Sequence, residues 1–326
     1  MSEWQAKLKS FLGQAAGKIL VWSLIAIAGL SALGAVGAVT AYLLITPRTF
    51  NLAKIEAENR IPGIIFYDAH GDILATRGAN HGDDITIKEL PDYLPKAFIA
   101  TEDRRFYSHF GVDPRGLLRA VWADLRAHRF VQGGSTITQQ LARNLFLSND
   151  KKLGRKLREM LYAVWLERHL TKNQILELYL NRIYFGAGTY GVDAASRFYF
   201  SKPAKNVSLA EAALLAGLPK APTKLSPTTE KGLSSAQARA RFVLANMLEA
   251  KYISNDAFAD ARAHPAAAAD HPVGVQYYLD YVYELLAELT QNNPKGKEDL
   301  VVETTLDARL QRKAEAAIAA IFCNPK

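Results

Sequence analysis

The hydrophobic and polar positions divide the chain into an apolar N-terminal segment and a long remainder that reads mostly as helices. From Ile19 to Thr46 no charged residue occurs, and nearly every position is apolar or small. At ~1.5 Å per residue, a helix of this length crosses a hydrocarbon core of ~30 Å with some tilt to spare. A cleaved signal peptide has a shorter apolar region, of about 7–15 residues. The pattern therefore predicts an uncleaved single-pass anchor over residues 19–46.

Positive charges beside this segment indicate its orientation. Lys7, Lys9 and Lys18 precede the apolar run, and Arg48 and Lys54 follow it. Basic residues favour the cytoplasmic side of a membrane. This mild bias predicts a cytoplasmic tail over residues 1–18, an anchor in the cytoplasmic (inner) membrane, and a catalytic domain outside.

The remainder begins with a short β-prone region and continues as helix after helix. Residues 63–67 and 72–76 are β-prone runs separated by a turn sequence, which predicts a small hairpin. From Pro95 onward the pattern is helical, because proline suits the first position of a helix. Further helices are predicted over residues 113–128, 136–147, 152–170, 172–185, 207–218, 235–250 and 275–290. This order predicts a mainly α fold and argues against a doubly wound sheet.

The overall composition is compatible with several classes of partner and does not select one of them. The 326 residues are 49% hydrophobic and 22% charged, which indicates a folded chain. The formal net charge of +8 suits nucleic acid, a membrane surface or a phosphorylated substrate. Since Cys323 is the one cysteine, neither an internal disulfide nor a cysteine-based metal site is possible.

Glu102 is the first candidate for chemistry. On a helix beginning near Pro95, Phe98, Glu102 and Phe106 are spaced to share one face. A carboxylate on an apolar face is costly unless it is paired or used, and desolvation raises its pKa toward the range of a general acid or base. The alternative is an ordinary helix end with solvated charges.

Residues 133–144 are the second candidate, because two glycines and two hydroxyl residues lead into a helix. Thr136 and Gln139 have the spacing of a capping box. The free N–H groups of such a helix start can bind an anion. The alternative is simply a capped helix.

The third candidate combines cations with a second carboxylate. Arg155 and Glu159 lie one helical turn apart, with Lys156 beside them. They form either an exposed ion pair, worth about a few tenths of a kcal/mol, or a carboxylate held among cations that bind phosphate.

Together, and in this order, these segments resemble the motifs of the family 51 glycosyltransferases, which occur in class A penicillin-binding proteins and in monofunctional peptidoglycan glycosyltransferases. The first motif, E-D-x-x-F-x-x-H-x-G, is met at every fixed position from Glu102 to Gly111. The other four are met by Gly133, Ser135, Thr136, Gln139 and Gln140; by Arg155, Lys156 and Glu159; by Lys172, Ile175, Leu176, Tyr179, Leu180 and Asn181; and by Arg239, Val243, Leu244 and Met247. Ala240 replaces a usual second arginine, a role that Arg241 could take.

The resemblance implies a lysozyme-like glycosyltransferase domain over residues 47–260. Its substrate is lipid II, an undecaprenyl-pyrophosphoryl disaccharide–peptide, which is polymerised into glycan strands with inversion at the anomeric carbon and release of undecaprenyl pyrophosphate. The resemblance implies that Glu102 is the general base and that Glu159 assists the leaving pyrophosphate, directly or through a divalent cation such as magnesium. No organic cofactor is implied. The substrate-binding residues implied are Arg143, Arg155 and Lys156 for the pyrophosphate, and Asp103, Phe106, His109, Ser135, Thr136 and Gln140 for the cleft.

The helix predicted over residues 113–128 has an apolar face. This face consists of Leu117, Leu118, Val121, Trp122 and Leu125, with several arginines nearby. The pattern is typical of an interfacial amphipathic helix. The alternative is a helix whose apolar face packs into the core.

Residues 261–326 resemble the linker that precedes the transpeptidase domain of class A penicillin-binding proteins. No K-T-G motif occurs, so no transpeptidase domain is expected in this chain. The expected partners are lipid II, the growing glycan, membrane lipid and other cell-wall synthesis proteins, but not nucleic acid. Two other functions stay open: a lytic enzyme that cleaves glycan strands, and an inactive membrane scaffold for cell-wall synthesis.

Overall fold

The computed structural model describes residues 22, 23, 25, 27–34, 36–47, 49, 51, 63–78, 83–127, 134–147, 153–269, 275–290 and 300–322. The chain separates into two units, Met1–Phe50 and Asn51–Lys326. In the N-terminal unit, the helix Ile27–Ile45 is the one helix of the described residues that is long and apolar enough to cross a membrane. The hydroxyl groups of Ser31 and Thr46 each donate to the carbonyl oxygen four residues earlier, so neither needs a partner outside the helix.

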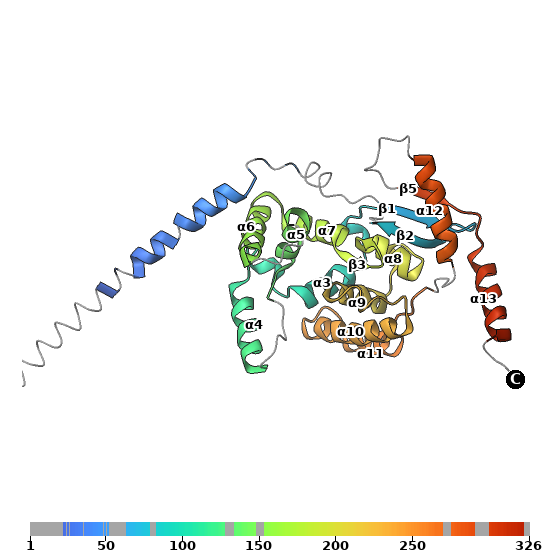
Figure 1. The fold of residues 1–326 in the computed structure, drawn as a ribbon. Coiled ribbons are helices and arrows are strands. Elements are labelled where there is room, and N and C mark those ends of the chain that lie inside the picture. Colours follow the sequence, from blue (N-terminus) through green and yellow to red (C-terminus); the bar gives the residue numbers. More distant parts are fainter. Residues whose placement is uncertain are drawn as a thin grey trace, which may run out of the picture. The chain divides into compact units, whose positions relative to one another are not determined.

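The second unit is mainly helical, as predicted (Figure 1). Its principal helices are α3 (Tyr93–Glu102), α4 (Pro114–Ala127), α5 (Ile137–Phe146), α6 (Leu153–His169), α7 (Lys172–Arg182), α8 (Val192–Phe200), α9 (Leu209–Gly217), α10 (Glu230–Glu249) and α11 (Asn255–Ala263). The main core forms around α9, whose residues are apolar on nearly every side and which packs against both α3 and α10. Phe98 of α3 extends this core, with its ring edge-on to Tyr179 and Phe185.

The predicted hairpin is confirmed. Strands β1 (Gly63–Tyr67) and β2 (Ile73–Gly78) pair antiparallel, and the Asp68 carboxylate accepts the backbone N–H groups of His70 and Asp72 within the turn. Strand β5 (Leu300–Glu303) adds to the other side of β1 in parallel. A segment near the C-terminus therefore completes a sheet that begins near residue 63.

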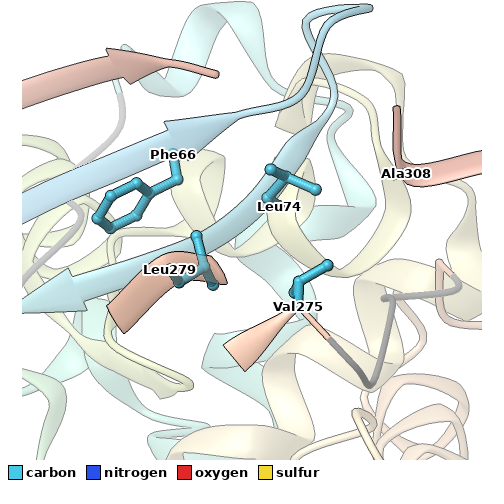
Figure 2. Packing of buried hydrophobic residues seen from close by; sticks show 5 residues of the cluster. All are labelled: Phe66, Leu74, Val275, Leu279 and Ala308. Atoms are coloured by element: carbon cyan, nitrogen blue, oxygen red, sulfur yellow. The ribbon is translucent and has the colours of Figure 1, made fainter. Parts of the chain in front are cut away.

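A second hydrophobic cluster lies between this sheet and helix α12 (Gln276–Thr290). Figure 2 shows Phe66 and Leu74 of the hairpin beside Val275 and Leu279 at the start of α12. Ala308, the first residue of α13 (Ala308–Phe322), completes the cluster. The residues from 261 onward thus provide one side of a small core.

All seven helices predicted beyond residue 112 are present, with shifted ends. Helix α7 stops at Arg182, three residues early, because Tyr184–Gly186 forms strand β3 and pairs with β4 (Thr189–Tyr190). Helix α10 begins at Glu230, five residues early, where the Thr229 side chain caps it. Helices α8, α11 and α13 and strand β5 were not predicted.

One detail of the sequence interpretation is wrong. Helix α3 ends at Glu102, and Asp103 has φ −157°, outside the helical region. Phe106 lies in a following 3-10 turn, Phe106–Ser108, so it cannot share a helical face with Phe98 and Glu102. Both phenylalanines are nevertheless buried.

Candidate active site

An open cavity of about 630 Å³ lies where α3 ends and α5 begins. The first turns of α4, the 3-10 turn Leu218–Lys220 and one face of α10 complete its walls. Its lining residues are Thr101, Glu102, Asp103, Arg104, Asp113, Gly116, Arg119, Gly134, Ser135, Thr136, Lys220, Arg239, Phe242, Asn246 and Glu249.

Glu102 presents its carboxylate to this cavity and is held by a chain of hydrogen bonds. Gln140 Nε2 donates to Glu102 Oε2 at 2.8 Å, and the Tyr179 hydroxyl donates to Gln140 Oε1 at 3.2 Å. Burial raises the pKa of Glu102 above its usual value, while the Gln140 hydrogen bond and the charges of Arg239 and Lys220 oppose that rise. Burial also raises the pKa of Tyr179 well above its usual value, which keeps its hydroxyl a donor.

Asp103 joins the first motif to the second. Its carboxylate accepts the backbone N–H of Ile137, the first residue of α5, at 3.1 Å. His109 Nε2 lies 2.9 Å from the same oxygen, and both side chains are buried. The His109 ring in turn packs edge-on against Phe106. Asp103 and His109 therefore fix the start of α5 relative to Glu102.

The capping box predicted for Thr136 is present and adds a second link. The Thr136 hydroxyl oxygen accepts the Gln139 N–H, and the hydroxyl group donates to the carbonyl oxygen of Gly111 at 2.6 Å. Gly111 has φ +79°, and a Cβ there would lie 2.8 Å from the backbone of Ala163. Only glycine fits this close approach to α6.

The second carboxylate, Glu159, is buried at 3% exposure, so the interpretation as an exposed ion pair is wrong for this residue. Glu159 Oε1 lies 3.3 Å from Arg155 Nε, and Glu159 Oε2 lies 2.9 Å from Lys156 Nζ. Lys156 also donates to Ser135 Oγ at 2.6 Å and to Gln139 Oε1 at 3.2 Å. Glu102 and Glu159 are thus linked to adjacent residues of α5, one directly and one through Lys156.

The described residues do not fit a divalent cation held by the protein alone. No group of three or more His, Cys, Asp or Glu side chains able to hold a metal occurs among them. Both oxygens of Glu159 face cations, from Arg155 and Lys156. The predicted divalent cation stays a prediction.

The predicted site residues divide into two groups. Glu102, Asp103, Ser135 and Thr136 line the cavity. The others lie outside its lining: Phe106, His109, Gln140, Arg143, Arg155, Lys156 and Glu159. Arg143 is exposed on α5, and its charge acts on Tyr179.

Several lining residues were not among the predicted site residues, and four lining residues lie on α10, of which Arg239 had been noted only as part of the fifth motif. Arg239, Phe242, Asn246 and Glu249 lie three or four positions apart, which places them on one helical face. The sequence shows this spacing, but it does not show that this face of α10 lies in the same cavity as Glu102. Arg241 is exposed and does not line the cavity, since two positions along a helix turn a side chain by about 200°. Whether Arg241 takes the role of the missing arginine stays a prediction, since Ala240 does not line the cavity either.

An ion pair fixes α10 to the end of α3. Arg104 Nη1 and Nη2 each lie 2.8 Å from a carboxylate oxygen of Glu249, and Nη2 also donates to Asn246 Oδ1 at 2.8 Å. Two parallel contacts of this kind set orientation as well as distance. The wall that α10 contributes to the cavity is therefore held to the end of α3.

The chain is similar to known proteins over most of its length. One family, described as transglycosylase, matches residues 70–248. Penicillin-binding protein 1A of Vibrio cholerae is 42% identical over 255 residues, which cover 77% of this chain and 31% of the relative. Penicillin-binding protein 1A of Escherichia coli is 39% identical over 281 residues, which cover 85% of this chain and 33% of the relative. The chain spans about a third of the length of the curated relatives it matches. A crystal structure of penicillin-binding protein 1A from Haemophilus influenzae aligns with 79% of this chain and 29% of its own, at a TM-score of 0.43 and 22% identity.

Proposed function

The chain belongs to the transglycosylase family, and from that premise we propose that it is a peptidoglycan glycosyltransferase that polymerises lipid II. The observation that carries the proposal is the carboxylate of Glu102, exposed to a cavity, held by Gln140 and raised in pKa by burial. A base of this kind can take a proton from a sugar hydroxyl near neutral pH.

In the proposed reaction, Glu102 accepts the proton of the acceptor's 4-hydroxyl group. The resulting oxygen attacks the anomeric carbon of the growing chain, a C–O bond forms with inversion, and the bond to undecaprenyl pyrophosphate breaks. The pyrophosphate leaves with the bonding electron pair. Because the leaving group is already good, no nucleophile from the protein is needed.

The group of Arg155, Lys156 and Glu159 is proposed to serve the leaving pyrophosphate. Two cations fixed by one buried carboxylate are preorganised, so they can stabilise developing negative charge without rearranging. Ser135 shares Lys156 with this group and also lines the cavity, which connects the two parts of the site.

A lipid-linked substrate requires the cavity to work beside a membrane. We propose that the apolar helix Ile27–Ile45 anchors the chain in the cytoplasmic membrane with residues 1–18 in the cytoplasm. The catalytic domain then lies outside, where lipid II and the growing glycan are its partners.

The deciding experiment compares wild type and Glu102→Gln on labelled lipid II, and separately on preformed glycan strands. Wild type should polymerise lipid II, and Glu102→Gln should lose at least about a hundredfold of the rate, since a general base contributes about 10²–10⁴-fold. Its thermal melting should match wild type. An unchanged rate in Glu102→Gln would refute the proposed base, and cleavage of strands without synthesis would indicate a lytic enzyme.

A further inference from the structure

We propose that Phe242 is a platform on which a pyranose ring of the acceptor sugar stacks beside Glu102. The inference rests on the proposed function and adds to it a residue that selects the acceptor. It starts from an apolar side chain whose position the packing of the fold does not explain.

Phe242 lies in the wall of the cavity and not in the core. Its side chain is 52% exposed, whereas its neighbours Val243, Leu244 and Met247 on the same helix are buried against the core. The core face of α10 is thus already provided by other residues. The exposed part of the ring forms part of the cavity wall, where a ligand can cover it.

The ring is held in place from one side. The guanidinium carbon of Arg239 lies 4.6 Å from the centroid of the Phe242 ring, a cation–π contact. Within the described residues, Arg239 Nε is buried and has no hydrogen-bond partner. The exposed area of Phe242 therefore belongs to its edge and its other face.

The surroundings of that ring suit a sugar. The C–H groups of a pyranose face carry slight positive charge and pack against the negative face of an aromatic ring. Asn246 and the Arg104–Glu249 pair follow on the same cavity wall, where they can meet the hydroxyl groups at the rim of such a sugar. Glu102, Arg239 and Phe242 line the same cavity, so a sugar stacked on Phe242 shares that cavity with the base.

This position identifies the sugar as the acceptor. The acceptor's hydroxyl group must reach Glu102, whereas the leaving pyrophosphate of the growing chain is assigned to Arg155 and Lys156. A lipid tail is the rival occupant of an exposed phenylalanine. The two occupants differ in the surface they bind: a lipid tail packs against any apolar side chain, whereas a sugar stacks on a flat aromatic ring.

The test therefore compares Phe242→Leu, which keeps apolar surface, with Phe242→Trp, which keeps an aromatic face. Tyr281→Ala serves as the control, since Tyr281 is similarly exposed at 59% but lies on α12, away from the cavity. Phe242→Leu should raise the KM for lipid II about fivefold to tenfold, the size of one aromatic contact, and change kcat less than twofold. Phe242→Trp should raise KM less than Phe242→Leu does, and Tyr281→Ala should stay within about twofold of wild type.

A second measurement does not depend on turnover. Binding of a soluble, lipid-free GlcNAc–MurNAc oligosaccharide is followed by saturation-transfer NMR in the Glu102→Gln background. Phe242→Leu should weaken binding by a similar factor, and Phe242→Trp should not.

The outcomes separate this inference from the proposed function. If Phe242→Leu matches wild type in KM and in oligosaccharide binding, the platform is refuted while polymerisation stands. If Phe242→Leu matches wild type but Phe242→Ser raises KM, the ring contacts lipid, which also refutes the platform. If wild type fails to polymerise lipid II, the proposed function fails, and oligosaccharide binding alone then decides whether Phe242 holds a sugar.

Discussion

Opposing influences act on the pKa of Glu102. Burial raises the pKa of its carboxyl group, and the hydrogen bond from Gln140 is the largest of the influences that lower it. The folded protein therefore binds this proton more tightly than the unfolded chain does. Its contribution to stability decreases as pH rises above the pKa of an unfolded glutamate. A base must be unprotonated, so activity should fall as pH decreases through the raised pKa of Glu102.

Gln140→Leu should move that acidic limb to higher pH. The change removes the donor at 2.8 Å from Glu102 Oε2 and leaves burial in place, so the pKa of Glu102 should rise further. The measurement is kcat/KM for lipid II against pH, with Gln311→Leu on α13 as a control for the loss of an amide. A uniformly lower rate with an unmoved limb would mean that Gln140 only positions the carboxylate.

Glu159→Gln should lower turnover per folded molecule by at least about tenfold, because it removes a charge that organises two cations beside the leaving group. Arg155→Ala should act in the same direction. Turnover in single-cycle lipid II assays is compared with the folded fraction from thermal melting. If both variants change only stability, the group is a structural ion pair.

For individual residues, the sequence predicted the site residues that lie within its short motifs. Glu102, Thr136 and Glu159 could be selected from spacing and from the resemblance, since their partners lie on neighbouring segments. Lys220 and Phe242 could not. They come to Glu102 from more than a hundred positions away, through the packing of α9 and α10, which no local pattern encodes.

Among the elements, most of the helices were predictable, but α8, α11 and the 15-residue α13 were not. Helix α8 follows Gly191, an N-cap residue with φ +89° and no side chain to cap the helix, so no start signal is visible. Helix α11 has a cap at Ser254 but buries only Ala261, so no apolar stripe marks it. Strand β5 depends on a partner strand more than two hundred positions earlier.

The apolar face of helix α4 was interpreted either as an interfacial surface or as a surface packed into the core. Leu117 and Leu118 are exposed, which favours a face that meets lipid. The side chains of Val121, Trp122 and Leu125 lie outside the described residues. The helix contributes Gly116 and Arg119 to the cavity, so a membrane on its apolar face would lie near the site proposed to bind a lipid-linked sugar.

Changing Leu118 and Trp122 together to Ser should weaken liposome binding by a protein of residues 48–326. Each apolar side chain in a bilayer is worth roughly 1.5–3 kcal/mol, so the double change should be clearly measurable by co-sedimentation. Leu310→Ser with Ile318→Ser, two exposed positions of α13, is the matched control. Undiminished binding together with a much lower melting temperature would show that the α4 face packs in the core.

In the second unit as a whole, two hydrophobic cores serve different purposes. The core around α9 supports α3 and α10, which present Glu102 and Phe242. The smaller cluster of Phe66, Leu74 and Leu279 joins the hairpin to α12. Backbone hydrogen bonds reinforce it, because the N–H groups of Ala69 and Thr304 cross between the hairpin and the segment after β5. None of the residues of this cluster lines the cavity.

The two cores should therefore respond separately to mutation. Leu279→Ala, at a position with 3% exposure, should lower the free energy of unfolding by about 2–4 kcal/mol, through lost burial and the cavity left behind. Leu285→Ala on the same helix, at 41% exposure, is the matched control and should cost about 1 kcal/mol or less. Urea unfolding measures both, and lipid II turnover is measured well below the transition. Because the cluster holds the sheet and not the walls of the cavity, turnover per folded molecule should stay at the wild-type value in both variants. A loss of turnover in Leu279→Ala at full folding would mean that the sheet and α12 also hold Glu102 or α10 in position, and the two cores would then have to be treated as one.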